Sequence, residues 1–197
     1  LVGDAEGAWP EVVEDLKVGR LKARYVGAPG VAQAGGVLPR WDLYRGKGYL
    51  PLNLIQYGRG CHFACDFCAV RSFLGPPRHK PVANVVREIE ALRRYNKTPG
   101  MLRVAFADDN IVSSRRYAAE LFRAMIPLDV RWSSQCSVDI AADDELLALA
   151  QASGCESLLI GFESLSQQSL DGVNKGRVNR VDDFAAAIAR LHAHKIM

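Results

Sequence analysis

Three cysteines, Cys61, Cys65 and Cys68, lie within eight residues of the chain in the spacing C-x-x-x-C-x-x-C. Thiolates bind soft metals, chiefly zinc and the iron of iron–sulfur clusters. A structural zinc site takes four ligands and an electron-transfer [4Fe–4S] cluster takes four cysteines, but no fourth cysteine follows nearby. Three thiolates on a [4Fe–4S] cluster leave one iron with an open position, which is what catalysis needs.

Two other interpretations fit the same spacing. A zinc ion could be bound by the three thiolates and a fourth ligand from elsewhere in the chain. The candidates for that fourth ligand are His62, His79, Cys136 and Cys155. Three buried free thiols are the second interpretation, and we disfavour it because three cysteines in so short a loop are too concentrated for packing. The zinc site therefore remains the main alternative to the cluster.

The elements that must position these thiols alternate in type along the chain. Apolar runs suited to buried strands occupy residues 50–57, 102–107, 130–136 and 157–162, and each is followed by a helical pattern. We expect Ser113 or Ser114, Asp143 and Asn179 to cap three of the helices, and Gly154 to end one. Strand–helix alternation predicts an α/β fold with parallel strands and right-handed crossovers.

Four strand–helix units do not close an eight-unit barrel. The chain is therefore either an open doubly wound sheet or part of a barrel that is cut short. Ile196 and Met197 resemble the first residues of a fifth strand, so we favour the cut barrel. In both folds, functional residues gather at the carboxyl ends of the strands.

Polar side chains follow each of these predicted strands. They are Asp108, Asp109 and Asn110 after the second strand, Ser133, Ser134, Gln135 and Ser137 at the third, and Glu163 and Ser164 at the fourth. Alternation along a strand allows only one parity to face a common site. We prefer the set Ser133, Gln135 and Ser137, which directs Cys136 towards the helices as a buried core thiol.

We expect structural or surface positions for most of the remaining ionisable residues. Cys155 precedes a strand at the opposite end and is expected to be structural. His192 and His194 are expected on the surface of the last helix. Arg71 and Arg78 flank the cysteine loop, where they could offset cluster charge or touch a substrate, although a solvated loop arginine is the commoner outcome.

Composition is that of an ordinary globular protein. The chain has 197 residues, of which 49% are apolar and 24% charged, and a net charge of +3. So small a charge does not argue for nucleic acid, and no apolar run approaches the length of a membrane span. Five cysteines without secretory features indicate a reducing compartment. We expect a cytoplasmic protein, peripheral to a membrane if its substrate is a lipid.

The cysteine loop resembles the signature of the radical S-adenosylmethionine superfamily. That signature has the same cysteine spacing and an aromatic residue directly before the last cysteine, here Phe67. It also follows the first strand of a partial (β/α)6 TIM-like barrel, as the loop does here. The resemblance covers residues 47–197 and implies a barrel truncated after about four β/α units.

The resemblance implies both cofactors and their contacts. A [4Fe–4S] cluster on Cys61, Cys65 and Cys68 would reductively cleave S-adenosylmethionine to methionine and a 5′-deoxyadenosyl radical, with electrons from a donor such as flavodoxin or ferredoxin. Residues expected to contact S-adenosylmethionine are Phe67, Asp108, Asp109, Ser133, Gln135 and Glu163. The family often has Gly-Gly-Glu where this chain has Asp108-Asp109-Asn110, so either aspartate could bind the methionine amino group, unless it serves as a helix cap.

The first residues point to a subfamily. Leu1 to Glu6, with Leu16 and Gly19, resemble the last helix of a cobalamin-binding domain, in which a V-G-E-x-E type segment is usual and Asp4 replaces the first Glu. We expect residues 1–46 to be the C-terminal remnant of such a domain plus a linker, and residues 47–197 to be an incomplete radical core. The D-x-H-x-x-G motif of that domain does not occur in the chain.

The implied reaction is cobalamin-dependent methylation of an unactivated carbon of a lipid or small metabolite. The segments 106–110 and 161–164 are similar to those of a subfamily that includes hopanoid methylases and the anaerobic magnesium-protoporphyrin cyclase. Two alternatives stay open: a methylthiotransferase that acts on RNA or protein, and a non-catalytic zinc-stabilised module.

Overall fold

The computed structural model describes residues 1–28, 38–44, 47–48, 53–95 and 101–197. The expected linker falls mostly outside these residues, as do the expected domain boundary near residue 46 and residues 50–52 of the first predicted strand. No helix in the described parts of the chain is long and apolar enough to cross a membrane.

Within these described residues, the strands form three separate sheets. The central sheet has the order β3-β6-β7-β8, and two small sheets pair β1 with β2 and β4 with β5. The strands are β1 (Val2–Gly3), β2 (Val26–Gly27), β3 (Asn53–Ile55), β4 (Gly58–Arg59), β5 (Arg78–His79), β6 (Leu102–Phe106), β7 (Val130–Cys136) and β8 (Cys155–Ile160).

The helices are α1 (Ala5–Lys17), α3 (Val70–Leu74), α4 (Val82–Tyr95), α5 (Arg115–Met125), α6 (Asp144–Ala152), α7 (Gln167–Asp171) and α8 (Phe184–Ala193). Helix α1 lies between β1 and β2, helices α3 to α6 lie between strands of the central sheet, and α7 and α8 follow its last strand. Short 3-10 turns lie at Trp41–Tyr44, Ile126–Leu128, Val138–Ala142 and Val181–Asp183.

The central sheet is parallel throughout, and its strands follow one another in chain order. A doubly wound sheet would reverse its strand order at a switch point, whereas a barrel does not. Met197 extends the pattern, because its N–H donates to Glu156 O (3.0 Å) and its carbonyl accepts from Leu158 N (2.8 Å). The partial TIM-like barrel is therefore confirmed, as an open and not a closed one.

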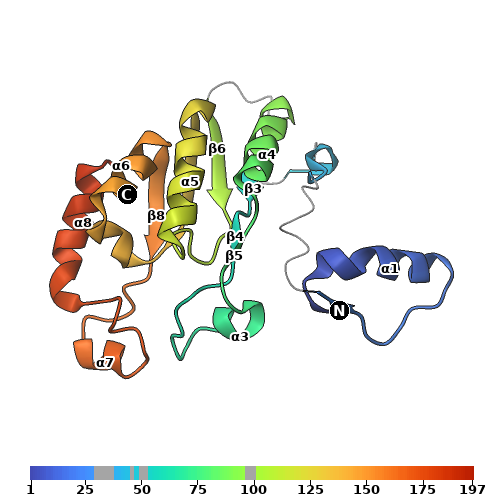
Figure 1. Ribbon diagram of the computed structural model, residues 1–197, viewed down its shortest axis with the longest axis horizontal. Coiled ribbons are helices and arrows are strands. Elements are labelled where there is room, and N and C mark those ends of the chain that lie inside the picture. Colours follow the sequence, from blue (N-terminus) through green and yellow to red (C-terminus); the bar gives the residue numbers. More distant parts are fainter. Residues whose placement is uncertain (29–37, 45–46, 49–52, 96–100) are drawn as a thin grey trace.

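One face of the sheet carries the core. Val104, Phe106 and Trp132 are buried there, and the Trp132 ring lies 4.9 Å from that of Phe122 on α5. The other face is open: Leu54 and Leu159 are 56% and 70% exposed. Figure 1 shows α3 and α7 below the carboxyl ends of the strands, and the unit of β1, α1 and β2 beside the sheet.

Some predicted boundaries and caps need correction. β8 begins at Cys155 and not at 157, so Cys155 lies in the strand and does not precede it. Ser114 occupies the cap position of α5 but makes no capping hydrogen bond, whereas Asp143 caps α6 as expected by accepting from Leu146 N. Asn179 caps no helix, because a 3-10 turn separates it from α8.

Candidate functional site

The cysteine loop is closed at its neck by a small antiparallel sheet. Gly58 and Arg59 of β4 pair with His79 and Arg78 of β5, so residues 60–77 form one loop between the two strands. Gly60 has a φ of +89°, and a Cβ there would lie 2.7 Å from Gly75 O at the far end of the loop. The two ends of the loop therefore touch, backbone to backbone.

All three cysteines of this loop line one cavity of about 370 Å³, together with Phe63 and Phe67. Cys68 N donates to Cys65 O (3.0 Å), which makes a tight turn between two of the thiols. Burial is the main cause that raises the pKa of the Cys65 thiol, and the Lys175 ammonium opposes it. Lys175 also lines the cavity.

A second loop holds the cysteine loop from outside. Asp66 N donates to Val173 O (3.1 Å), and Asn174 Nδ2 donates to Asp66 Oδ1 (2.7 Å). Arg71 Nη1 donates to Cys61 O (3.3 Å), so this arginine is tied to the loop backbone. The two bonds of Asp66 join the cysteine loop to the segment between α7 and α8, which follows the strand at the far edge of the central sheet, β8.

The two aspartates after β6 have different roles in the structure. Asp108 is buried, and its two oxygens accept from Tyr57 N (2.8 Å) and Gly58 N (2.6 Å). Burial raises the pKa of Asp108 to about 7, although both hydrogen bonds lower it. Asp109 is half-buried, lines the cavity and accepts from Gly60 N (2.9 Å). Of the pair, Asp109 alone faces the cavity.

The end of β7 gives the cavity its polar floor. Ser133 and Gln135 lie on the open face, opposite the buried Ser134 and Cys136. Gln135 lines the cavity, whereas Ser133 is not among the lining residues. Ser137 lies after the strand, is buried and also lines the cavity. The Cys136 thiol is buried in the core cluster, although this residue also borders the cavity.

Glu163 lies after β8 in a backbone conformation that is unusual for its type, with a φ of +67°. Its carboxylate turns back over Gly161, where a Cβ would come within 2.2 Å of Glu163 Oε1. Asn179 supports this bend, because its Nδ2 donates to Gly161 O (2.9 Å) and Phe162 O (3.0 Å). Glu163 lines the same cavity as the three cysteines.

The donor set of the cavity suits an iron–sulfur cluster. Among the described residues, no group of three or more His, Cys, Asp or Glu side chains converges as ligands of a single metal ion would. A [4Fe–4S] cluster does not require such convergence, because each thiolate binds a different iron. Three thiols around one cavity, with carboxylate and amide groups across from them, fit a cluster with an open iron.

The Radical SAM superfamily profile matches residues 55–197. The chain belongs to the radical SAM superfamily. Members of this family use a [4Fe–4S] cluster and S-adenosylmethionine. The choice left open by the thiol spacing is thereby settled for the cluster and against the zinc-stabilised module.

Curated relatives of the chain are methyltransferases and cyclases. A bacteriochlorophyllide d C-12(1)-methyltransferase of Chlorobaculum tepidum is 32% identical over 202 residues, which is 100% of this chain and 44% of that protein. An anaerobic magnesium-protoporphyrin IX monomethyl ester cyclase of Synechocystis is 28% identical over 158 residues, 79% of this chain and 30% of that protein. The chain thus spans less than half the length of these relatives.

Solved structures agree on the fold. The radical S-adenosylmethionine methyltransferase TsrM of Kitasatospora setae, with tryptophan and an S-adenosylmethionine analogue bound, superposes with a TM-score of 0.78 at 20% identity. The match covers 100% of this chain and 44% of that one. The cobalamin-dependent enzyme OxsB, with aqua-cobalamin bound, gives a TM-score of 0.75 at 18% identity over 98% of this chain and 32% of that one.

Two residues that shape the site were not found from the sequence. Asn174 and Lys175 lie in a segment that carries no metal-ligand spacing and no strand-end polar run. Asn174 and Lys175 do precede a glycine in Asn174-Lys175-Gly176, a turn composition, but nothing in the sequence places that turn against residues more than 100 positions earlier.

Proposed function

We propose that the protein is a cobalamin-dependent radical SAM methyltransferase that methylates an unactivated carbon of a lipid or small metabolite. The observation that carries this proposal is the similarity of the whole chain, residues 1–28 included, to a methyltransferase and to the fold of TsrM and OxsB, both of which have been solved with cobalamin bound. The bacteriochlorophyllide and magnesium-protoporphyrin relatives favour a tetrapyrrole as substrate.

The chain's own residues divide the work of the site. Cys61, Cys65 and Cys68 would hold the cluster, which would supply the electron for reductive cleavage of S-adenosylmethionine. Asp109 would accept hydrogen bonds from the methionine ammonium, because both oxygens of Asp108 already accept from backbone N–H groups. Phe67, Gln135 and Glu163 contact the same ligand, and Ser133 lies deeper on the open face.

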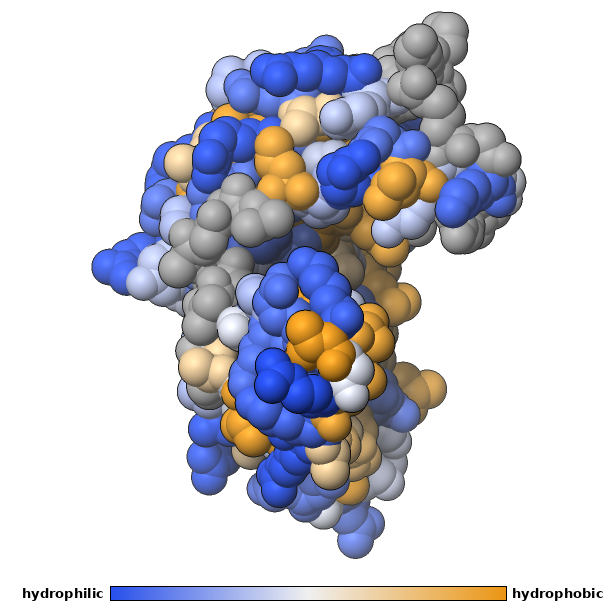
Figure 2. All heavy atoms as spheres, turned by 90° about the vertical axis from the view of Figure 1, so that its right-hand side faces the viewer, coloured by the Kyte–Doolittle hydropathy of each residue, from blue (hydrophilic) through white to orange (hydrophobic). Residues whose placement is uncertain are grey.

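Residues 1–46 belong, in this proposal, to a cobalamin-binding domain and its linker. The unit of β1, α1 and β2 supports this assignment because it exposes apolar side chains that a larger domain would cover. These are Trp9, Leu16, Val18, Leu21 and Val26. Figure 2 shows hydrophobic atoms among hydrophilic ones over the face that carries this unit.

All five cysteines are free thiols in the structure. Free thiols fit a reducing compartment, and we place the enzyme in the cytoplasm with flavodoxin or ferredoxin as its electron donor. A lipid substrate would bring it to a membrane surface.

The first test is anaerobic reconstitution of the full-length protein, followed by EPR of the reduced cluster with and without S-adenosylmethionine. A [4Fe–4S] signal that changes when S-adenosylmethionine is added, and that is lost in Cys61→Ser, supports the site. Formation of 5′-deoxyadenosine and transfer of a deuterated methyl group to a magnesium tetrapyrrole, dependent on added hydroxocobalamin, supports the reaction. A cluster indifferent to S-adenosylmethionine contradicts the site, and methylation without cobalamin contradicts the mechanism.

The magnesium-protoporphyrin relatives favour a second candidate reaction, ring closure on a tetrapyrrole. Mass spectrometry of the product separates the two. A gain of one deuterated methyl group identifies the methyltransferase, whereas loss of hydrogen from the substrate without gain of a methyl group identifies the cyclase.

A further inference from the structure

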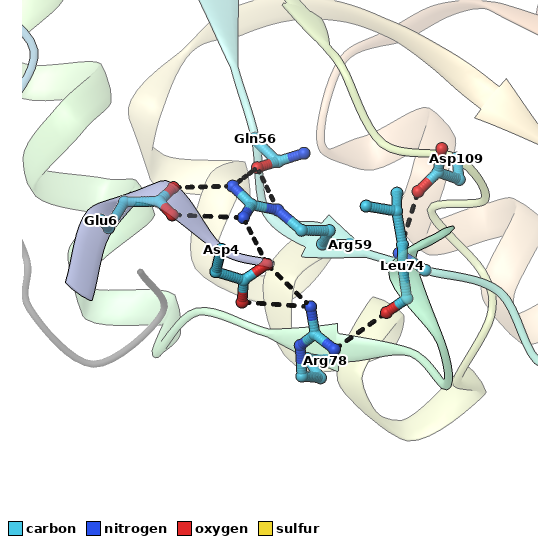
Figure 3. A network of polar contacts seen from close by, with 8 residues as sticks. Asp4, Glu6, Gln56, Arg59, Leu74, Arg78 and Asp109 are labelled. Carbon is cyan, nitrogen blue, oxygen red and sulfur yellow. Dashed lines mark hydrogen bonds and ion pairs between the residues drawn. The ribbon is translucent and has the colours of Figure 1, made fainter. Parts of the chain in front are cut away.

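The carboxylate of Asp4 reaches from the N-terminal unit to the neck of the cysteine loop. Asp4 lies between β1 and α1, and only 7% of it is exposed. An aspartate at this position usually accepts from the first N–H groups of its helix. Here Asp4 makes no such capping bond, and its side chain points instead at two arginines of the radical core (Figure 3).

These two arginines come from the two strands that close the cysteine loop. Arg59 on β4 donates from Nη1 to Asp4 Oδ1 (3.0 Å). Arg78 on β5 donates from Nη2 to both Asp4 oxygens (3.3 and 3.2 Å). One carboxylate therefore bridges the strands on either side of residues 60–77, in addition to the two residue pairs, Gly58 with His79 and Arg59 with Arg78, of that small sheet.

The two arginines depend on Asp4 to different degrees. Arg59 also donates to Glu6 Oε1 (2.8 Å) and to Gln56 Oε1 (2.8 Å), so it keeps partners if Asp4 is lost. Arg78 otherwise donates to Leu74 O (2.9 Å), and its buried Nε finds no acceptor among the described residues. Asp4 is the carboxylate that Arg78 contacts in the described chain.

The backbone of Asp4 is fixed from the other side. β1 and β2 pair in parallel, and a Cβ on Gly27 would lie 1.6 Å from Asp4 O. The N-terminal unit thus packs directly against the Asp4 main chain while the radical core holds its side chain. Because the main chain of Asp4 is fixed in the N-terminal unit and its carboxylate binds the radical core, Asp4 couples the position of one unit to that of the other.

We propose that Asp4 is a positioning residue that holds β4 and β5 together at the base of the cysteine loop and fixes the position of the N-terminal unit relative to this loop. Loss of the carboxylate leaves Arg59 and Arg78, two part-buried cations, side by side without the anion between them. Like charges at short range repel, and the short β4–β5 pair then has little to hold it closed. The loop opens more often, and its thiols are reached more easily from solvent.

The test compares Asp4→Asn, Asp4→Glu and Glu6→Gln in the full-length apoprotein under reducing, anaerobic conditions. Glu6→Gln is the matched control, because in the described part of the chain the Glu6 carboxylate pairs with Arg59 and does not bridge the two strands. The measurement is the rate at which iodoacetamide alkylates each cysteine, read by peptide mass spectrometry. Cys136 and Cys155, buried in the core, are the internal references.

Asp4→Asn is expected to raise the alkylation rates of Cys61 and Cys68 about five-fold, a change typical of losing a part-buried ion pair. Asp4→Glu keeps the negative charge, so its alkylation rates are expected to stay close to those of the wild type. Glu6→Gln is expected to change the rates less than two-fold. In the reconstituted protein, Asp4→Asn should release iron to a chelator faster while the fresh cluster keeps its EPR signal.

Three results would overturn the proposal. They are unchanged rates in Asp4→Asn, an equal rise in Glu6→Gln, and an equal rise at Cys136 and Cys155, which would mean general unfolding. Because the rates are measured without S-adenosylmethionine, cobalamin or substrate, the outcome does not depend on whether the proposed methylation is correct.

Discussion

Asn110 and Ser137 join the ends of β6 and β7 by hydrogen bonds that run in both directions. Asn110 Nδ2 donates to Ser137 Oγ (3.0 Å), while Ser137 N donates to Asn110 Oδ1 (3.2 Å). The same amide nitrogen lies 3.9 Å from Cys61 Sγ. Asn110 thus connects the floor of the cavity to the first cysteine.

Asn110→Ala should therefore destabilise the fold. Asn110 Oδ1 also accepts from Val112 N (3.3 Å), so the substitution leaves two buried backbone N–H groups without an acceptor. We expect the free energy of unfolding to fall by about 2–4 kcal/mol, measured by urea denaturation of the reduced apoprotein. Asn110→Asp keeps the acceptor oxygen, so its free energy of unfolding should fall less. Equal falls in both variants would contradict this account.

Gly161→Ala should weaken binding of S-adenosylmethionine without unfolding the protein. The new Cβ would collide with the Glu163 carboxylate, the far end of a flexible side chain, so Glu163 moves while the backbone stays. We expect about a ten-fold loss of affinity, equal to about 1.4 kcal/mol, measured by EPR titration of the reduced cluster.

A double variant isolates the cause of that loss. If Gly161→Ala acts through Glu163, then Gly161→Ala combined with Glu163→Gln should bind no more weakly than Glu163→Gln alone. Additive losses would show that Gly161 acts by another route.

Gly60→Ala should open the cysteine loop. A Cβ at this residue would meet Gly75 O at 2.7 Å and Pro76 O at 2.8 Å, and backbone atoms cannot move aside as a side chain can. With the cost of a positive φ added, we expect a loss of about 3 kcal/mol or more in stability, together with poor iron retention after reconstitution.

Gly19→Ala is the matched control for Gly60→Ala. Gly19 also has a positive φ (+67°), but nothing lies within 4 Å of its Cβ position. Gly19→Ala should lower the free energy of unfolding only by the cost of placing an alanine at a positive φ, about 1 kcal/mol. Thermal unfolding and iron content of the two variants separate crowding from backbone conformation, and equal effects would contradict the crowding argument.

Sequence patterns predicted the elements of the central sheet well, because burial repeats along each strand. The run at residues 130–136 coincides with β7 as Val130–Cys136, and its alternation correctly separates Trp132 from Gln135. β8 starts earlier than predicted because Gly154, with a φ of +91°, turns the chain directly into the strand. The thiols and Asp109 lie around one cavity, as the strand-end rule implies.

Contacts between segments that are distant along the chain could not be predicted from the sequence. Strands β4 and β5 have two residues each and pair across about twenty positions, so no periodicity marks them. Arg78 was expected to be a solvated loop residue, but it pairs with Asp4, 74 positions away. Asn179 has a sequence typical of a helix cap, yet its amide supports the bend at Gly161. Each depends on tertiary proximity that composition does not encode.

Asp108 should make the stability of the protein fall as pH rises from about 4 to about 7. Burial raises the pKa of its carboxyl to about 7, more than the N–H groups of Tyr57 and Gly58 lower it. The folded state then holds the proton more tightly than the unfolded state, in which an aspartate titrates near pH 3.9. The stabilising contribution is complete below about pH 4 and is lost as pH passes through about 7.

Asp108→Asn cannot titrate and supplies the comparison. The unfolding free energy of the wild type minus that of Asp108→Asn should fall with pH between about 4 and 7, by at most about 4 kcal/mol at 1.36 kcal/mol per pKa unit. His79, whose pKa burial lowers, has the opposite slope but is present in both proteins and cancels. Urea unfolding at a series of pH values measures the difference, and a difference that stays constant would mean that the two backbone hydrogen bonds, and not burial, set the ionisation of Asp108.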